Sequence, residues 1–126
     1  MKKMYLTLPL FALIVACGGG NEKKEDAGET TAVVDLSSNP DYQKGLELVG
    51  KSDCLTCHKV SEKNIGPAYK DVAAKYENTD ENVKMLAAKI IKGGQGVWGV
   101  IPMTPHTSLS EADAEQMVKY ILLLKK

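Results

Sequence analysis

Two cysteines and a histidine stand within five residues of one another in the stretch CLTCH, Cys54 to His58. Thiolates and neutral imidazoles are ligands for soft and borderline metals, and two nearby thiols can also form a disulfide or exchange one. The only other cysteine, Cys17, lies far upstream in a different sequence context. Residues 54–58 are therefore the strongest candidates for chemistry in this chain.

Four kinds of site compete for this cluster. The C-x-x-C-H pattern is typical of covalent haem attachment, in which the two thiols add to vinyl groups on one edge of the porphyrin and the adjacent histidine reaches the iron. A zinc site needs further ligands at regular spacing, whereas His106 is 48 residues from His58. A redox dithiol normally follows a strand, and a Cys54–Cys57 disulfide leaves His58 unexplained. The sequence therefore predicts one haem c attached through Cys54 and Cys57.

A haem iron bound by His58 can take a second ligand from the protein. The candidates are Met85, Met103, Met117 and His106. Met85 and Met117 fall within predicted helices and are expected in the core, whereas Met103 lies in an irregular stretch with proline on both sides. Met/His ligation raises the reduction potential and is typical of electron-transfer centres. We therefore predict His58 and Met103 as the iron ligands.

The spacing of apolar residues predicts four amphipathic helices to position these residues, and no stretch shows the alternating pattern of a strand. The first begins with a capping Asn39 and Pro40, and the last begins after Ser110. The four apolar stripes are Tyr42, Gly45, Leu46 and Val49; Tyr69, Val72, Ala73 and Tyr76; Val83, Leu86, Ala87 and Ile90; and Ala114, Met117, Val118 and Ile121. Between the last two helices, residues 93–108 contain four glycines and two prolines, which predicts a long functional loop. Residues 39–126 are therefore predicted to form one all-α domain.

The N-terminal segment predicts export and lipidation. A short basic start is followed by 12 apolar residues, Tyr5 to Ala16, too few for a bilayer span of about 20 residues. The segment ends in IVAC, which resembles the lipobox of bacterial lipoproteins, and a plain secretory signal is the alternative. We expect residues 1–16 to be a signal peptide, Cys17 to be lipidated and residues 17–38, rich in glycine and charge, to be a flexible linker.

Composition limits the remaining possibilities. Basic and acidic side chains number 16 each, so the chain offers no basic stripe for nucleic acid, and we expect no nucleic-acid partner. The whole chain holds one Trp, five Tyr and one Phe. A domain this small with so few large apolar side chains commonly needs a cofactor, metal or disulfide for stability, which agrees with the haem prediction.

Four stretches together resemble the short class I cytochromes c of bacteria: CLTCH, IGPAYKDVAAKY, GGQGVWGVIPM and LSEADAEQMVKYIL. The resemblance covers the whole predicted helical domain. It implies the class I cytochrome c fold, with four to five short helices around one covalent haem. It also implies His58 as the proximal ligand, Met103 as the distal ligand, and Gly45 against Tyr120 where the first and last helices cross.

The resemblance assigns three further residues to the haem. The carbonyl of Pro67 is implied to accept a hydrogen bond from the ring of His58, and Trp98 to donate one to a haem propionate. Lys89 takes a position where the family often has a basic residue near that propionate. One departure concerns His106, since relatives often have an asparagine there that bonds the methionine sulfur. We expect His106 either to lie near the sulfur or to be exposed, and to bind the iron in Met103→Ala if it is near.

These observations predict a monomeric, monohaem electron carrier that is not an enzyme. The resemblance implies transient redox partners, such as a respiratory complex, a terminal oxidase or a nitrite reductase. The lipid on Cys17 implies an extracytoplasmic, membrane-anchored protein. The alternatives are a haem-based sensor or ligand-binding protein with a labile sixth ligand, and an enzymatic haem protein such as a peroxidase. Carbon monoxide binding to the reduced protein would reveal the open coordination site that both require.

Overall fold

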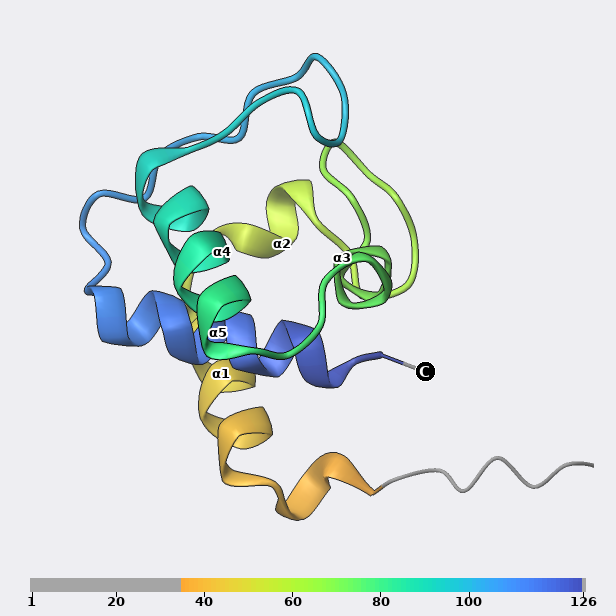
Figure 1. Cartoon of the computed structure of the whole chain (residues 1–126), viewed down its shortest axis with the longest axis vertical. Coiled ribbons are helices and arrows are strands. Elements are labelled where there is room, and N and C mark those ends of the chain that lie inside the picture. Colours follow the sequence, from red (N-terminus) through yellow and green to blue (C-terminus); the bar gives the residue numbers. More distant parts are fainter. Residues whose placement is uncertain (1–34, 126) are drawn as a thin grey trace, which may run out of the picture. The chain divides into compact units, whose positions relative to one another are not determined.

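The computed structural model describes residues 35–125, which contain one 3-10 helix and five α-helices. In chain order they are η1 (Leu36–Ser38), α1 (Pro40–Lys51), α2 (Cys54–Cys57), α3 (Tyr69–Lys75), α4 (Asp80–Lys92) and α5 (Glu111–Leu123) (Figure 1). The only β pairing within these residues is an isolated bridge between Gly94 and Met103. The all-α prediction is confirmed. The predicted signal peptide, Cys17 and most of the predicted linker lie outside the described residues.

The helices begin where the sequence predicts. Asn39 Oδ1 accepts a hydrogen bond from the Tyr42 amide at 3.1 Å, and Pro40 occupies the first turn of α1. Thr79 and Ser110 cap α4 and α5 with their hydroxyls in the same way. These side chains satisfy amides that have no partner within the helix. Periodicity did not indicate two short elements, the single turn α2 and the 3-10 helix η1. Because η1 spans Leu36–Ser38, regular structure begins a few residues before Asn39, within the predicted linker.

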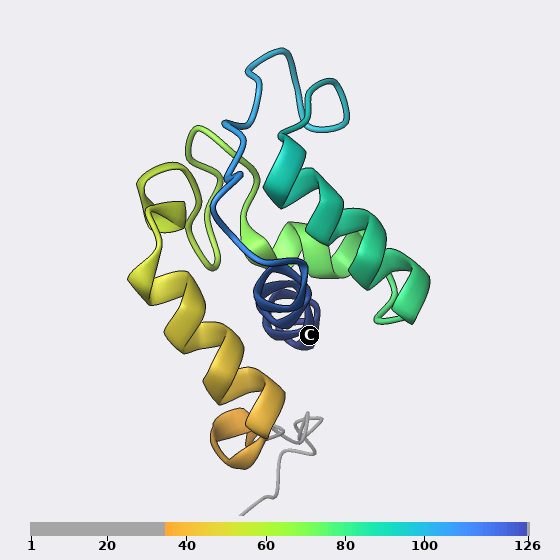
Figure 2. The same ribbon diagram turned by 90° about the vertical axis from the view of Figure 1, so that its left-hand side faces the viewer.

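Helix α5 is the centre of the domain. Its buried residues are Ala114, Met117, Val118, Tyr120, Ile121 and Leu122. It packs against α1, α3 and α4, and Figure 2 views it almost end-on between α1 and α4. No helix in the described range is long and apolar enough to cross a membrane. The stability of this part of the fold therefore comes from burying α5 on several sides.

The crossing of α1 and α5 is unusually close at Gly45. A Cβ atom at this position would lie 2.3 Å from Tyr120 Cβ and 2.5 Å from the Gln116 carbonyl oxygen, so only glycine fits. The ring of Tyr120 also meets that of Tyr42 edge-on, with centroids 5.1 Å apart. The predicted contact between Gly45 and Tyr120 is confirmed.

One residue departs from the predicted apolar stripes. Leu46 is 43% exposed, whereas Gly45 and Val49 are buried against α5. Leu48, which is outside the predicted stripe, packs against the core instead. The close approach at Gly45 leaves α1 only a narrow buried face, and Leu46 lies beyond its edge.

Candidate functional site

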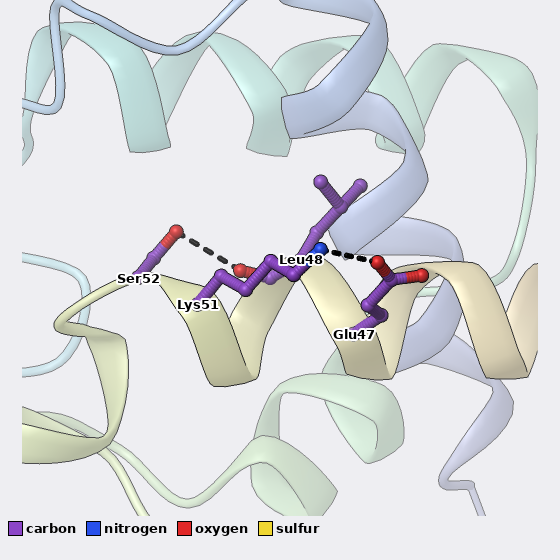
Figure 3. Close-up of polar contacts among 4 residues, drawn as sticks. All are labelled: Glu47, Leu48, Lys51 and Ser52. Carbon is purple, nitrogen blue, oxygen red and sulfur yellow. Dashed lines mark hydrogen bonds and ion pairs between the residues drawn. The ribbon is translucent and has the colours of Figure 1, made fainter.

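The C-terminal end of α1 leads directly into the cysteine motif. Ser52 Oγ donates a hydrogen bond to the Leu48 carbonyl at 2.9 Å, and Lys51 pairs with Glu47 one turn earlier (Figure 3). The Ser52 amide also donates to the Val49 carbonyl at 3.3 Å. The two Ser52 hydrogen bonds close the end of the helix where the chain enters residues 53–58.

Helix α2 brings the two thiols to one side of the chain. Cys54 and Cys57 are three residues apart on a single helical turn, which places their side chains on the same face. Both are half-buried and neither is in a disulfide. The His58 amide donates to the Cys54 carbonyl at 3.0 Å, so the turn closes at the histidine.

The ring of His58 is held in one orientation by three neighbours. Its Nδ1 lies 2.8 Å from the carbonyl oxygen of Pro67. A carbonyl oxygen only accepts, so Nδ1 donates the hydrogen bond, and the lone pair of the neutral ring is on Nε2. The ring of Tyr69 stacks on it with centroids 5.3 Å apart. On another side, a Cβ atom at Gly66 would lie 2.5 Å from His58 Cε1.

Burial makes the thiol of Cys54 a poor redox nucleophile. It raises the pKa of Cys54 above the ordinary value for a thiol and also raises the pKa of the neighbouring Tyr69 hydroxyl. Reactive redox cysteines have a lowered pKa, because the thiolate is the nucleophile. Residues 35–125 also contain no strand before the motif. Both findings disfavour a redox dithiol at Cys54 and Cys57.

Residues 93–108 form the irregular loop that the sequence predicts. Gly93 ends α4 with φ at +77°, and the Met103 amide donates to the Gly94 carbonyl at 2.8 Å. The His106 amide donates to the Ile90 carbonyl at 3.1 Å, which ties the far side of the loop to α4. Backbone hydrogen bonds therefore hold Met103 in place although no helix or strand contains it.

A cavity of about 480 Å³ lies between these segments and α4 and α5. Its lining includes every predicted haem residue of the described range: Cys54, Cys57, His58, Pro67, Lys89, Trp98 and Met103. The volume falls within the range of about 300–1,000 Å³ that is usual for ligand and cofactor sites. Met85, Met117 and His106, the other candidates for the sixth ligand, also line it. Met117 is only 1% exposed and belongs to the core cluster, as predicted, whereas Met85 is only half-buried and lies outside that cluster.

The residues present fit a covalently bound haem. The cavity combines a largely apolar lining with two thiols on one turn and an imidazole whose Nε2 lone pair is left for a metal. They do not fit a zinc centre, because within residues 35–125 no three His, Cys, Asp or Glu side chains cluster as metal ligands. A porphyrin instead supplies most of the metal ligands itself, so few protein ligands are needed.

Trp98 and Lys89 lie at the outer part of this lining. Trp98 is 38% exposed, and the Lys75 ammonium lies 5.6 Å from the centroid of its ring. Lys89 is exposed on α4, with its aliphatic stem beside Gly94. The predicted contacts of Trp98 and Lys89 with haem propionates remain predictions.

The structure places His106 where sequence reasoning did not. Its side chain is only 17% exposed, so of the two expected alternatives, a position near the methionine sulfur or an exposed one, the exposed one is wrong. Its Nε2 lies 2.9 Å from Asp53 Oδ1, and its Nδ1 is buried without a hydrogen-bond partner. The sequence contains no signal for this contact, since the two residues are 53 positions apart. The stacking of Tyr69 on His58 was also missed.

Comparison with known proteins gives consistent matches. The sequence model of the family described as Cytochrome c matches residues 42–125. Cytochrome c-552 of Nitrosomonas europaea is 47% identical over 83 residues, covering 66% of this chain and 81% of the relative. The crystal structure of that wild-type cytochrome covers 64% of this chain and 99% of its own, with a TM-score of 0.60 and 48% identity. A class 1 cytochrome of Sideroxydans lithotrophicus, 22% identical with a TM-score of 0.53 over 67% of this chain and 96% of its own, supports the fold alone.

Proposed function

Because the chain belongs to the cytochrome c family, we propose that it is a membrane-tethered electron carrier whose iron is bound by His58 and Met103. It has the class I cytochrome c fold and carries one haem c, covalently bound through the Cys54 and Cys57 pair. It is an electron-transfer protein and not an enzyme. The bound haem supplies one iron that exchanges a single electron between its ferric and ferrous states.

His58 is the first iron ligand in this proposal. Its hydrogen bond to the Pro67 carbonyl fixes the tautomer with the lone pair on Nε2, and the stacked ring of Tyr69 limits rotation. Hydrogen bonds of this kind orient a ligating imidazole and increase its basicity. The role of Pro67 is therefore to hold the ligand rather than to contact the iron.

Met103 is the second ligand. The observation that supports it best is that Met103 and His58 line one cavity while each is held by a backbone hydrogen bond. Met85 lines the same cavity from within α4, where the helix geometry fixes its backbone. The loop that carries Met103 is held by its own hydrogen bonds, so it can place the thioether at the iron without any change in a helix, which favours Met103 over Met85. Trp98 and Lys89 supply an indole N–H and an ammonium group for the haem carboxylates.

Exposed apolar side chains mark the surface on which we expect redox partners to dock. Apart from Leu46, the large exposed hydrophobic residues within residues 35–125 are Leu55, Val60, Ile65, Val97, Trp98, Val100 and Ile101. They belong to two segments, residues 55–65 and 97–101, which both contribute to the cavity lining. A redox partner binding there would bury these side chains in a small, transient interface close to the cofactor. Terminal oxidases and nitrite reductases are the partner classes that we propose.

The site of action is extracytoplasmic in this proposal. The sequence supports a signal peptide at residues 1–16 followed by a lipidated Cys17, and the linker after Cys17 lets the haem domain reach its partners. Multiple acyl chains anchor a protein stably, whereas one chain binds a membrane only marginally. Cys17→Ser should therefore release a soluble haem protein or leave an uncleaved precursor. A wild-type protein found free in the soluble extracytoplasmic fraction would contradict the tether.

Met103→Ala tests the ligation. The reduced wild type should bind almost no carbon monoxide at neutral pH, whereas Met103→Ala should bind it readily and lose the weak charge-transfer band of thioether-bound ferric haem. Met85→Ala is the matched control, because it removes a thioether from the same cavity and should leave both properties unchanged. Carbon monoxide binding by the wild type would favour the sensor alternative instead.

A further inference from the structure

A hydrogen bond between two side chains joins the segments that hold the thiols and Met103. His106 Nε2 donates to Asp53 Oδ1 over 2.9 Å. Asp53 directly precedes Cys54, and His106 follows Met103 by three residues. Both Asp53 and His106 line the cavity. The bond therefore links two parts of the cavity lining that are 53 residues apart in the sequence.

We propose that Asp53 and His106 form a clasp that holds the Met103 loop against the cysteine segment and limits the access of outside ligands to the iron. The proposal rests on the iron ligation described above. His106 is fixed from two directions, because its amide also donates to the Ile90 carbonyl at 3.1 Å. Opening the loop around Met103 would require breaking the bond to Asp53. His106 is thus a positioning residue for Met103.

The position of the proton on the His106 ring distinguishes the clasp from two other roles, a hydrogen bond to the Met103 sulfur and ligation of the iron. A carboxylate only accepts, so Nε2 of His106 donates to Asp53, and Nδ1 of the neutral ring has no proton. Nδ1 is buried without a hydrogen-bond partner. In this state His106 cannot donate a hydrogen bond to the Met103 sulfur. Its Nε2 is also occupied by Asp53 and is not available to the iron.

The other ion pairs around the motif cannot act as clasps. Glu47 with Lys51, shown in Figure 3, lies within one helix, and Lys59 with Glu62 spans three residues. The clasp differs because it is long-range and because the His106 side chain is only 17% exposed. The Asp53 side chain is 78% exposed, so water competes for the bond. Its loss should therefore change loop opening by roughly two- to fivefold rather than by orders of magnitude.

The test measures how fast added imidazole replaces the native sixth ligand in the ferric holoprotein. The readout is loss of the thioether charge-transfer band. Asp53→Ala, His106→Ala and the double variant should each react roughly two- to fivefold faster than the wild type, and by the same factor, because each removes one clasp. Asp53→Asn, which keeps an oxygen acceptor, should restore much of the wild-type rate. Glu47→Ala is the control, since it removes an exposed carboxylate whose partner lies within α1.

Amide hydrogen exchange in the same proteins gives a second readout. The amides of Met103 and His106 donate to Gly94 and Ile90, and both should exchange faster in Asp53→Ala by a similar factor. Additive effects of Asp53→Ala and His106→Ala, or an Asp53→Ala rate equal to that of Glu47→Ala, would overturn the clasp. Absence of the charge-transfer band from the wild type would instead contradict Met103 ligation, and amide exchange would still test the clasp.

Discussion

The crossing of α1 with α5 and the loop at residues 93–108 are held in place by different interactions. At the crossing, Gly45 lies against Tyr120, which is 2% exposed, and the surrounding residues belong to one buried core. In the loop, the apolar side chains of Val97, Val100 and Ile101 are 53%, 83% and 62% exposed. Side-chain packing therefore fixes the crossing, whereas hydrogen bonds, mainly from the backbone and with the side-chain bond of His106 to Asp53, fix the loop.

This difference shows which part of the fold depends most directly on the haem. Buried apolar surface stabilises the crossing whether or not the cavity is filled. The loop borders the cavity and buries little against the rest of the protein, so a bound cofactor is the main source of further contacts. We therefore expect changes at the crossing to alter global stability, and changes in the loop to alter ligation.

The largest effect is expected from removing the attachment of the haem. In Cys54→Ala with Cys57→Ala the covalent haem is lost, and with it the stability that a ligand of the folded state supplies by linkage. Small domains have only about 5 kcal/mol or somewhat more to lose, so we expect an exported but largely unfolded chain. Far-UV circular dichroism and thermal melting measure this. A cooperative melt of the haem-free variant would show that the α1–α5 crossing suffices for folding.

A methyl group at the crossing should give the next largest loss of stability. In Gly45→Ala the new Cβ meets Tyr120 Cβ at 2.3 Å, and the helices must move apart, at a cost of about 1–3 kcal/mol. Urea unfolding of the holoprotein measures the loss, and the charge-transfer band should be unchanged. Gly50→Ala is the control in the same helix, where nothing lies within 4 Å, and should stabilise by up to about 1 kcal/mol. Equal effects of the two substitutions would refute this account.

In the loop, comparing alanine substitutions at two glycines with positive φ distinguishes the effect of backbone strain from the effect of displacing the ligand Met103. Gly93 has φ at +77° and a Cβ there would lie 2.6 Å from the Met103 carbonyl oxygen, whereas Gly96, at φ +95°, has open space around it. Alanine should cost about 1–2 kcal/mol at either position because of φ. Only Gly93→Ala should also weaken the charge-transfer band, since it pushes on Met103. An unchanged band in Gly93→Ala would contradict this.

The smallest effect is expected at alkaline pH. Burial raises the pKa of Tyr120 above its ordinary value of about 10, so the folded state holds the phenolic proton more tightly than the unfolded state. This contribution to stability is complete below pH ~10 and decreases as pH rises through the raised pKa. Tyr120→Phe should therefore lose less stability than the wild type in that range. Urea titrations at several alkaline pH values measure the free energy of unfolding. The same dependence of this free energy on pH in Tyr120→Phe and the wild type would contradict the prediction.

The sequence alone predicted the features that depend on neighbouring residues. Asn39 and Ser110 mark helix starts because a cap acts over three residues. The spacing of Cys54, Cys57 and His58 indicates haem because the porphyrin edge fixes where two thiols can attach. Periodicity likewise indicated the buried faces of α3, α4 and α5. These properties are local, and a local pattern is sufficient to specify them.

Other features were decided only by the tertiary structure. Leu46 has the right spacing for the core but is exposed, because the close approach at Gly45 narrows the buried face of α1. The stacking of Tyr69 on His58 and the bond between Asp53 and His106 join residues whose separation has no period in the sequence. Such contacts depend on how the loop and helices meet in space. A single sequence records the residue types on both sides of these contacts but not their distance.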